Sequence, residues 1–433
     1  MKTTDLYQLY LSCGGNVTTD SRNCTPDALF FALKGEKFNG NAFAAKALEA
    51  GCAYVIVDEA DYIPANDARY ILVDNCLKAL QQLANYHRCR LGTPLIAITG
   101  TNGKTTTKEL TATILSQAYR VLYTKGNLNN HIGVPLTLLR LKEVHQLGVI
   151  EMGASRPGDI KELVEIAEPD FGIITNVGKA HLEGFGSLEG VIQTKGELYD
   201  YLRTHQSGTI FIHHENDALM KMTDGLIPVF YGSDDNLYVN GVITGNSPHL
   251  SFRWKSGKEG MWHDVQTHLI GEYNFLNVLA AICIGRFFKV EPALMSKAIR
   301  TYLPNNSRSQ WQQTAYNALI IDAYNANPTS MRASISNFLN LTADGKMLIL
   351  GDMLELGKES TAEHQLLVDF IVECGFQDVV LVGNEFASVH HPFKVYPDVE
   401  ALIQAVQTHN LRQKTILIKG SNGMKLDRVV PYL

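Results

Sequence analysis

A strand, a glycine-containing loop and a helix are predicted to follow one another directly within residues 94–110, and this succession constrains the fold most. Leu95–Ile98 is apolar and partly β-branched, as a buried strand requires. Gly100 and Gly103 allow backbone angles that other residues avoid, and Lys104 then opens the helix. Because strand, loop and helix form the repeating unit of parallel sheets, the sequence predicts an α/β protein.

The loop between that strand and that helix has the chemistry of a phosphate site. The first amides of a helix have no partners within it, and the helix dipole favours an anion at this end. Lys104 adds a positive charge, and the Thr105 hydroxyl is the usual Mg²⁺ ligand in such a loop. Ile98 stands where the general G-x-x-x-x-G-K-[ST] pattern has its first glycine, so an ordinary glycine turn is the alternative. The residues expected at the ATP phosphates are Gly100, Thr101, Asn102, Gly103, Lys104, Thr105 and Thr106.

Length and composition indicate the class of protein. The 433 residues are expected to form about three domains, at 1–92, 93–304 and 305–433. The net charge of -6 does not favour nucleic acid as a partner, so a nucleotide has to be bound by local groups. The seven cysteines form no C-x-x-C pair, which favours reduced thiols and a cytoplasmic location over disulfides or a zinc site. No apolar signal core and no run near the ~20 residues that span a bilayer is present, so no membrane is expected.

The first segment predicts a small α/β domain with one candidate substrate site. Tyr54–Val57 and Tyr70–Val73 are expected strands between helical stretches. Ser21, Arg22 and Lys34 could hold a diphosphate, because hydroxyl and cationic donors suit phosphate oxygens. On chemistry alone, a solvated turn is the better interpretation of the first two.

The second segment predicts a mostly parallel sheet with helices on both faces, in which ligands bind at the carboxyl ends of the strands. Glu151 follows the apolar strand Leu147–Ile150, where its carboxylate could ligate Mg²⁺. His181 follows another apolar run. Lys195 precedes Gly196, which costs roughly 1 kcal/mol in a helix interior and so suggests close packing or a close ligand. Taken alone, each of these three polar side chains is more often exposed or structural than functional.

Two further features close this segment. Residues 229–270 alternate short β-like runs with turns and are expected to form a small antiparallel insertion. Asn274 and Asn277 lie three apart, hence on one face near the start of a helix. Their carboxamides both donate and accept, so they could bind an adenine edge; capping of the helix is the alternative.

The third segment begins after a polar, proline-containing joint at Leu303–Ser309. It predicts a βαβ repeat, Rossmann-like in layout, without the G-x-G-x-x-G signature of a dinucleotide site. Asp322 and Asn325, at the end of an expected strand, are candidates for contacts to the ribose. Arg308 is a candidate for contacts to the phosphates.

Motifs in all three segments, in order, resemble those of the Mur ligase family. Thr99–Thr106 resembles the ATP loop of this family and of the related folylpolyglutamate synthetases. Asp20–Arg22 followed by Ala32–Glu36 resembles the family's UDP-binding N-terminal domain. Tyr324–Pro328 and Gly351–Gly357 resemble its C-terminal domain. The resemblance therefore covers the whole chain.

This resemblance implies roles for individual residues. The implied ligands of two Mg²⁺ ions are Thr105, Glu151, His181 and a carbamylated Lys195. The implied UDP ligands are Ser21, Arg22 and Lys34. The implied residues of a substrate loop are Asn127, Asn129 and Asn130.

Within the family, the chain is most similar to members that add D-alanyl-D-alanine. Residues 126–135 resemble their substrate loop, and the Asp-Asn-Pro-Arg motif of members that add diaminopimelate or lysine is absent. Ser155 and Arg156 are a departure, because Asn-His is usual at these two positions.

The implied activity is that of a monomeric, cytoplasmic, ATP-dependent ligase of peptidoglycan synthesis. Its substrates would be UDP-N-acetylmuramoyl-tripeptide and D-alanyl-D-alanine, joined through an acyl phosphate. The C-terminal domain would close over ATP about a hinge near residues 305–308 and exclude water. Two alternatives remain: a folylpolyglutamate synthetase, which typically lacks the first segment, and an ATPase without ligase activity.

Overall fold

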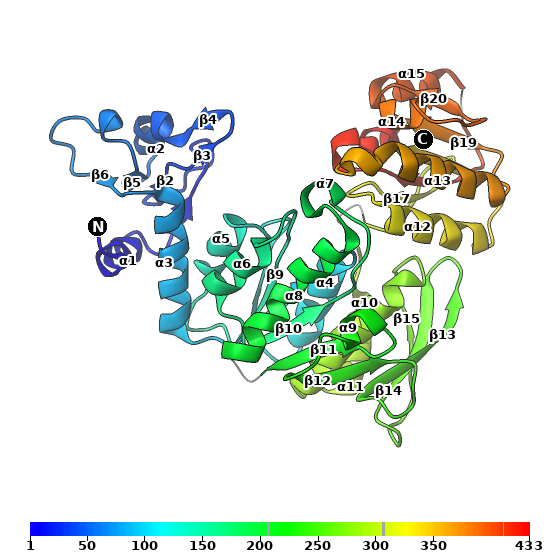
Figure 1. Cartoon of the computed structure of the whole chain (residues 1–433), viewed down its shortest axis with the longest axis horizontal. Coiled ribbons are helices and arrows are strands. Elements are labelled where there is room, and N and C mark those ends of the chain that lie inside the picture. The colour runs from blue at the N-terminus through cyan, green and yellow to red at the C-terminus, as the bar shows by residue number, and fades with distance from the viewer. Residues whose placement is uncertain (206–207, 305–307, 410) are drawn as a thin grey trace.

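The computed structural model describes residues 1–205, 208–304, 308–409 and 411–433. Three α/β parts follow one another along the chain (Figure 1). The N-terminal part (blue) and the C-terminal part (orange and red) lie on opposite sides, with the central part (cyan to green) between and below them. Within the described ranges, no helix has the length and apolarity needed to cross a bilayer.

The N-terminal part is built on a parallel sheet in the order β1-β2-β5-β6, with a separate two-stranded ribbon. The strands are β1 (Val17–Thr18), β2 (Leu29–Phe31), β5 (Tyr54–Val57) and β6 (Tyr70–Leu72), and the ribbon is β3 (Lys34–Gly35) and β4 (Phe38–Asn39). The helices are α1 (Thr3–Ser12), α2 (Ala44–Glu49) and α3 (Cys76–Leu91), with 3₁₀ turns η1 (Gly40–Phe43) and η2 (Ala60–Tyr62).

Helix α3 fixes this part to the central part through buried polar contacts. Arg88 donates from Nε to the carbonyl oxygen of Ala167 over 2.7 Å and pairs with Asp170 at 3.1 Å. The His87 Nε2 atom lies 3.0 Å from the carbonyl oxygen of Leu141. Because these partners belong to the central part, α3 forms the junction between the two parts.

The central sheet has the order β15-β14-β13-β12-β11-β10-β7-β9-β8, and pairing is parallel from β8 to β13. The strands are β7 (Leu95–Thr99), β8 (Val121–Tyr123), β9 (Leu147–Glu151), β10 (Phe171–Ile174), β11 (Thr209–His213), β12 (Ile227–Gly232), β13 (Val239–Asn246), β14 (Leu250–Ser256) and β15 (His263–Gln266). The helices are α4 (Lys104–Leu115), α5 (Gly133–Leu138), α6 (Asp159–Ala167), α7 (Leu182–Phe185), α8 (Leu188–His205), α9 (Asp217–Met220), α10 (Tyr273–Phe287) and α11 (Pro292–Thr301).

Helices cover both faces of this sheet, as the sequence predicts. On β7, Ile96 and Ile98 join the core formed with α4, α10 and α11. Leu95 and Ala97, which point to the opposite face, join the core formed with α3, α5, α6 and α8. This alternation explains why every residue of β7 is buried, and it confirms the expected fold class.

The expected antiparallel insertion at residues 229–270 is confirmed for the pairing of β13, β14 and β15 and is wrong for β12. Strand β12 pairs in parallel with β11, β13 pairs in parallel with β12, and only β14 and β15 are antiparallel additions at the sheet edge. Val239, Phe252 and Trp254 are buried in the same core as α10 and α11. Because these apolar side chains need that cover, the segment extends the central sheet instead of forming a separate unit.

The C-terminal part is a six-stranded sheet in the order β16-β17-β21-β18-β19-β20, parallel except for the edge strand β16. The strands are β16 (Gln310–Gln313), β17 (Ala318–Asp322), β18 (Lys346–Gly351), β19 (Val379–Val382), β20 (Lys394–Tyr396) and β21 (Thr415–Lys419). The helices are α12 (Pro328–Asn340), α13 (Ser360–Glu373), α14 (Asn384–Ala387) and α15 (Val399–His409), with 3₁₀ turns η3 (Gly357–Glu359), η4 (Asn422–Met424) and η5 (Leu426–Tyr432). Of the expected hinge at 305–308, residues 305–307 lie outside the described residues.

Candidate active site

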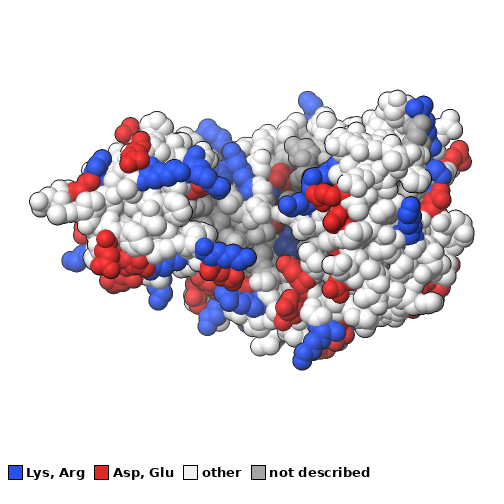
Figure 2. Space-filling model, turned by 90° about the horizontal axis from the view of Figure 1, so that it is seen from above, with Lys and Arg blue, Asp and Glu red and all other residues white. Residues whose placement is uncertain are grey.

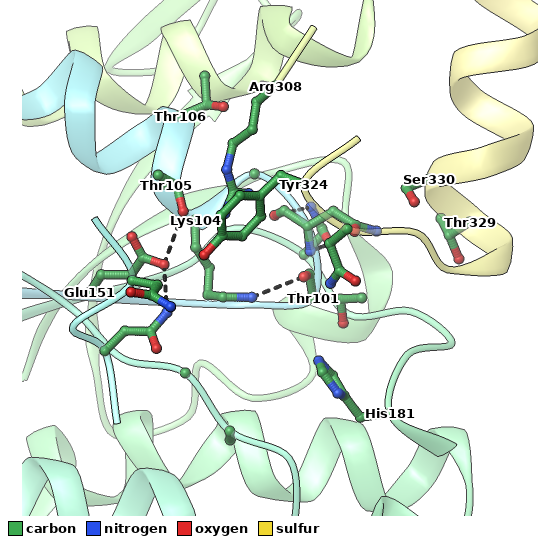
Figure 3. A pocket seen from close by; sticks show the side chains of 18 of the residues that line it. Thr101, Lys104, Thr105, Thr106, Glu151, His181, Arg308, Tyr324, Thr329 and Ser330 are labelled. Carbon is green, nitrogen blue, oxygen red and sulfur yellow. Dashed lines mark hydrogen bonds between the residues drawn. The ribbon is translucent and has the colours of Figure 1, made fainter. Parts of the chain in front are cut away.

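A cavity of about 720 Å³ lies at the carboxyl ends of the central parallel strands, where the C-terminal part faces them (Figure 3). Its walls include the segments after β7, β8, β9, β10 and β17 and the first turns of α10. The predicted site residues that line it are Thr101, Asn102, Gly103, Lys104, Thr105, Thr106, Asn127, Asn129, Asn130, Glu151, His181, Asn274, Asn277, Arg308, Asp322 and Asn325. Gly100 precedes the lining residues and is not one of them.

Protein contacts alone fix the shape of the phosphate loop. Gly100 and Gly103 have φ angles of 135° and 81°, in the region that favours glycine. A Cβ atom on Gly103 would lie 2.2 Å from Asn277 Oδ1, so a larger residue there would displace the Asn277 side chain. The Asn102 N–H donates to Asn176 Oδ1 over 3.0 Å, which joins the loop to the segment after β10.

Lys104 lies beneath this loop. Its Nζ donates to the carbonyl oxygens of Gly100 (2.6 Å) and Thr101 (3.0 Å) (Figure 3). Burial lowers the pKa of Lys104 to about 8, although the nearby Glu151 charge opposes this shift. The amine is therefore mostly protonated at neutral pH and can contribute a positive charge to a phosphate site.

Glu151 ends β9 and is buried beside the loop. Thr105 Oγ1 donates to its Oε1 over 3.0 Å, and Asn129 Nδ2 donates to the same oxygen over 2.8 Å (Figure 3). The other oxygen, Oε2, is buried and has no hydrogen-bond partner among the described residues. Because Mg²⁺ commonly takes one or two carboxylates together with phosphate oxygens and water, Thr105 and Glu151 fit such an ion.

His181 lines the same cavity but contacts the C-terminal part through its side chain. The His181 Nδ1 atom lies 2.6 Å from Glu355 Oε2, which belongs to the loop after β18. In the described ranges, no three His, Cys, Asp or Glu side chains gather as a preformed metal site. The fit to Mg²⁺ therefore rests on Glu151 and the Thr105 hydroxyl.

Lys195 lies on α8 and is not among the residues that line the cavity. Its side chain is buried, with Nζ 5.4 Å from the centre of the Phe185 ring. Burial, and secondarily the charge of Lys104, lower its pKa well below 10.5. A lysine with a lowered pKa has a larger neutral, nucleophilic fraction, which is the form that carbamylation requires.

Asn274 and Asn277 reach the cavity from the first turns of α10. Asn274 Nδ2 donates to the Ile270 carbonyl oxygen (2.8 Å), and Asn277 Nδ2 donates to Asn274 Oδ1 (3.0 Å). Helix capping, the alternative interpretation, is wrong, because both residues lie inside a helix that begins at Tyr273 and their amides donate to oxygens.

The C-terminal part supplies a basic and aromatic wall. The Arg308 guanidinium lies 3.9 Å from the centre of the Tyr324 ring, and its Nε is buried without a hydrogen-bond partner among the described residues. Asp322 Oδ2 accepts from Lys419 Nζ (2.7 Å) and from Ser334 Oγ (3.0 Å). Arg308 therefore has an unused donor, whereas one oxygen of Asp322 is already satisfied by the protein.

Asn327 connects the C-terminal part directly to the phosphate loop. Its Nδ2 donates to Asn102 Oδ1 over 2.8 Å, while its own Oδ1 caps α12 by accepting from the Ser330 N–H over 2.9 Å. The position of the phosphate loop is thus linked to the position of the C-terminal part.

The predicted UDP ligands Ser21, Arg22 and Lys34 lie in the N-terminal part, outside this cavity. Arg22 donates from Nε and Nη2 to the Asp20 carboxylate (2.9 and 2.8 Å), and Lys34 pairs with two carboxylates at 3.0 and 2.8 Å. Figure 2 shows that the molecule is hollowed between the N-terminal part and the rest, with Lys and Arg side chains on both sides. A substrate that used both sites would span this hollow.

Several contact residues were not singled out from the sequence. Tyr324 and Asn327 lie within the string Tyr324–Pro328, and Glu355 lies within Gly351–Gly357. Both strings resemble family motifs, which marks the two segments. A motif does not show which of its side chains contacts another domain. Further residues that line the cavity without having been predicted include Asn176, Tyr273, Ser155 and Arg156.

Comparison with known proteins gives one family for the whole chain. Residues 15–88 match the model described as "Mur ligase family, catalytic domain", residues 98–285 match "Mur ligase middle domain", and residues 307–422 match "Mur ligase, glutamate ligase domain". The UDP-N-acetylmuramoyl-tripeptide--D-alanyl-D-alanine ligase of Bacillus subtilis is 36% identical over 96% of this chain and 92% of its own length. The Escherichia coli protein of the same name is 34% identical over 96% of this chain and 93% of its own length.

Solved structures agree with the sequence matches. A crystal structure of MurF from Acinetobacter baumannii has a TM-score of 0.85 at 29% identity and covers 98% of this chain and 97% of its own. The MurF ligase from Thermotoga maritima, solved in complex with ADP, has a TM-score of 0.83 at 25% identity and covers 96% of each chain. Similarity over the full length, together with three family domains in order, shows that the chain belongs to the Mur ligase family.

Proposed function

We propose that the chain is the ATP-dependent ligase that joins D-alanyl-D-alanine to UDP-N-acetylmuramoyl-tripeptide in peptidoglycan synthesis. The observation that carries the proposal is a single cavity in which Lys104, Thr105 and Glu151 face Arg308 of the C-terminal part. The relatives at 36% and 34% identity bear the name of this ligase.

Amide synthesis requires an activated acid, because a free carboxylate would have to expel oxide. In the proposed reaction the γ-phosphoryl group of ATP passes to the terminal carboxylate of the tripeptide, which yields ADP and an acyl phosphate. The amine of D-alanyl-D-alanine then attacks the acyl carbon and loses a proton. The C–N bond forms, and phosphate leaves with the electron pair of the broken C–O bond.

The chain's own groups would stabilise the charge on the transferring phosphoryl group. Lys104 and the loop amides would bind the phosphates from the central side, and Arg308 would bind them from the C-terminal side. Mg²⁺ held by Thr105 and Glu151 would neutralise charge on the phosphate oxygens. The proposed adenine and ribose contacts are Asn274, Asn277, Asp322 and Asn325.

Further parts of the proposal concern the remaining predicted residues. We assign His181 and a carbamylated Lys195 to a second Mg²⁺; His181 would bind the ion through Nε2, because its Nδ1 contacts Glu355. The UDP group would bind at Ser21, Arg22 and Lys34. The peptide would cross the hollow toward the loop that carries Asn127, Asn129 and Asn130, here called the asparagine loop. The seven free cysteines support a reducing, cytoplasmic location, and we propose a monomer.

Phosphate release tests this function. The protein is supplied with ATP, Mg²⁺ and UDP-N-acetylmuramoyl-tripeptide, with and without D-alanyl-D-alanine. We expect sustained phosphate release only with both acceptor substrates, and no turnover in Lys104→Ala. Release that is indifferent to the dipeptide would point to an ATPase and contradict the proposal.

A further inference from the structure

Lys108 lies one helical turn after Lys104 on α4, and its side chain is fully buried. A buried ammonium is costly unless its charge and its hydrogen bonds are satisfied. Its Nζ donates to the Thr124 carbonyl oxygen over 2.7 Å and lies 2.8 Å from Glu109 Oε1. A third neighbour is Glu151, whose Oε2 is 3.7 Å away.

The distance between Lys108 and Glu151 determines whether the ammonium forms a hydrogen bond with the carboxylate or only attracts its charge. At 3.7 Å the two atoms are too far apart for a hydrogen bond, yet close enough for a strong attraction in a buried site. Lys108 thus offsets the carboxylate charge without occupying the lone pairs of Oε2. The other oxygen is fixed by Thr105 and Asn129, so the carboxylate is oriented while one oxygen keeps its lone pairs.

Lys108 also fixes the backbone around Glu151. The Thr124 carbonyl oxygen accepts from Lys108. The Thr124 hydroxyl oxygen accepts from the Glu151 N–H over 3.0 Å. Thr124 also stands at the start of the segment that carries Asn129. One ammonium therefore connects the phosphate-loop helix, the end of β9 and the asparagine loop.

We propose that Lys108 is a positioning residue that holds the Glu151 carboxylate in the orientation from which it ligates the nucleotide-bound metal. This inference rests on the proposed function, because it takes Glu151 as a metal ligand. Groups that orient a metal ligand typically change metal affinity by roughly 10- to 100-fold. A lysine that only braced α4 would change stability without an effect that depends on Glu151.

The test measures Mn²⁺ affinity of the ADP-bound protein by electron paramagnetic resonance, with Mn²⁺ in place of Mg²⁺ and without turnover. Lys108→Gln removes the charge and can still donate to the Thr124 carbonyl, whereas Lys108→Met removes both. Glu109→Gln is the matched control, because it breaks the same ion pair and leaves the ammonium beside Glu151. Thermal unfolding is measured for every variant, and only variants with a cooperative transition enter the comparison.

We expect Lys108→Gln and Lys108→Met to weaken Mn²⁺ binding by about tenfold or more, and Glu109→Gln to change it by less than about threefold. In a Glu151→Gln background, either Lys108 substitution should add less than about twofold, because the group it positions is gone.

Unchanged or tighter Mn²⁺ binding in Lys108→Gln would overturn the inference, as would a full loss that persists in the Glu151→Gln background. Failure of the proposed function is distinguishable. The wild type could form no amide while the Lys108 variants still bind Mn²⁺ more weakly. The proposed substrates would then be wrong, and the role of Lys108 at Glu151 would stand.

Discussion

Glu355 of the C-terminal part and His181 of the central part are in contact, with Oε2 and Nδ1 2.6 Å apart. The Glu183 N–H donates to the Glu355 carbonyl oxygen over 3.3 Å, and Lys179 pairs with Glu363 at 2.7 Å beside it. The C-terminal part is thus docked on the segment that carries His181. While this docking persists, His181 Nδ1 is not available to a metal.

Glu355→Gln should lower the free energy of unfolding only slightly. More than half of the Glu355 side chain is exposed (57%), so the loss should stay below about 1 kcal/mol. The hydrogen bond from His181 lowers the pKa of Glu355 below 4.5. Its contribution is therefore complete above pH 4.5 and is lost as the pH falls through the lower folded-state pKa. Denaturation of wild type and variant should differ at neutral pH and converge in acid; a difference that persists in acid would contradict this.

The affinity for a non-hydrolysable ATP analogue should fall at alkaline pH. Lys104 loses its proton near pH 8 in the nucleotide-free protein, because burial lowers its pKa. Each further pH unit lowers the protonated fraction by up to about tenfold. Calorimetric titration across neutral and alkaline pH measures the effect, and Lys104→Met, with weaker binding throughout, should lack this decline. An identical pH dependence in the variant would assign the titration to another group.

Lys195 should react with carbon dioxide. Its lowered pKa enlarges the neutral amine fraction, and attack of that nitrogen on carbon dioxide gives a carbamate with the loss of one proton. Carbon-labelled bicarbonate should give a carbamate signal by nuclear magnetic resonance, and removal of carbon dioxide should lower ligase activity. Lys195→Gln should lose the signal, while the exposed Lys161→Gln should retain it. A signal retained in Lys195→Gln would place the carbamate elsewhere.

Two substitutions of Asn327 separate its two roles. Asn327→Ser keeps an oxygen that can cap α12, whereas Asn327→Ala should lower the free energy of unfolding by about 1 kcal/mol through loss of the cap. Both variants lose the amide that donates to Asn102, so both should raise the KM for ATP to a similar extent. Denaturant titration and steady-state kinetics measure the two effects. A wild-type KM in Asn327→Ser would remove this contact from ATP binding.

Much of the central site could be predicted because parallel strands end at one sheet edge. Thr99 is paired with Ile174, and Ile98 is paired with Glu151. The residues that follow these strands therefore meet at one edge, as the sequence predicts for a parallel sheet.

Contacts between domains could not be predicted in the same way. The pairing of His181 with Glu355 depends on how two separately folded sheets dock, and no local periodicity encodes that docking. The way in which residues 229–270 continue the central sheet could not be predicted for a related reason. Their alternating pattern is the same for a separate hairpin and for an extension of a sheet, and only the cover that α10 and α11 give to Trp254 decides between them.

The central claim is that this cavity transfers phosphate to the peptide acid before the amide bond forms. The most direct measurement supplies tripeptide substrate whose terminal carboxylate carries a heavy oxygen isotope, together with ATP, Mg²⁺ and D-alanyl-D-alanine, and analyses the released phosphate by mass spectrometry. With both carboxylate oxygens labelled, the account predicts one labelled oxygen in each phosphate released and one retained in the amide, because the C–O bond of the acyl phosphate breaks. Unlabelled phosphate, with the amide formed, would contradict it.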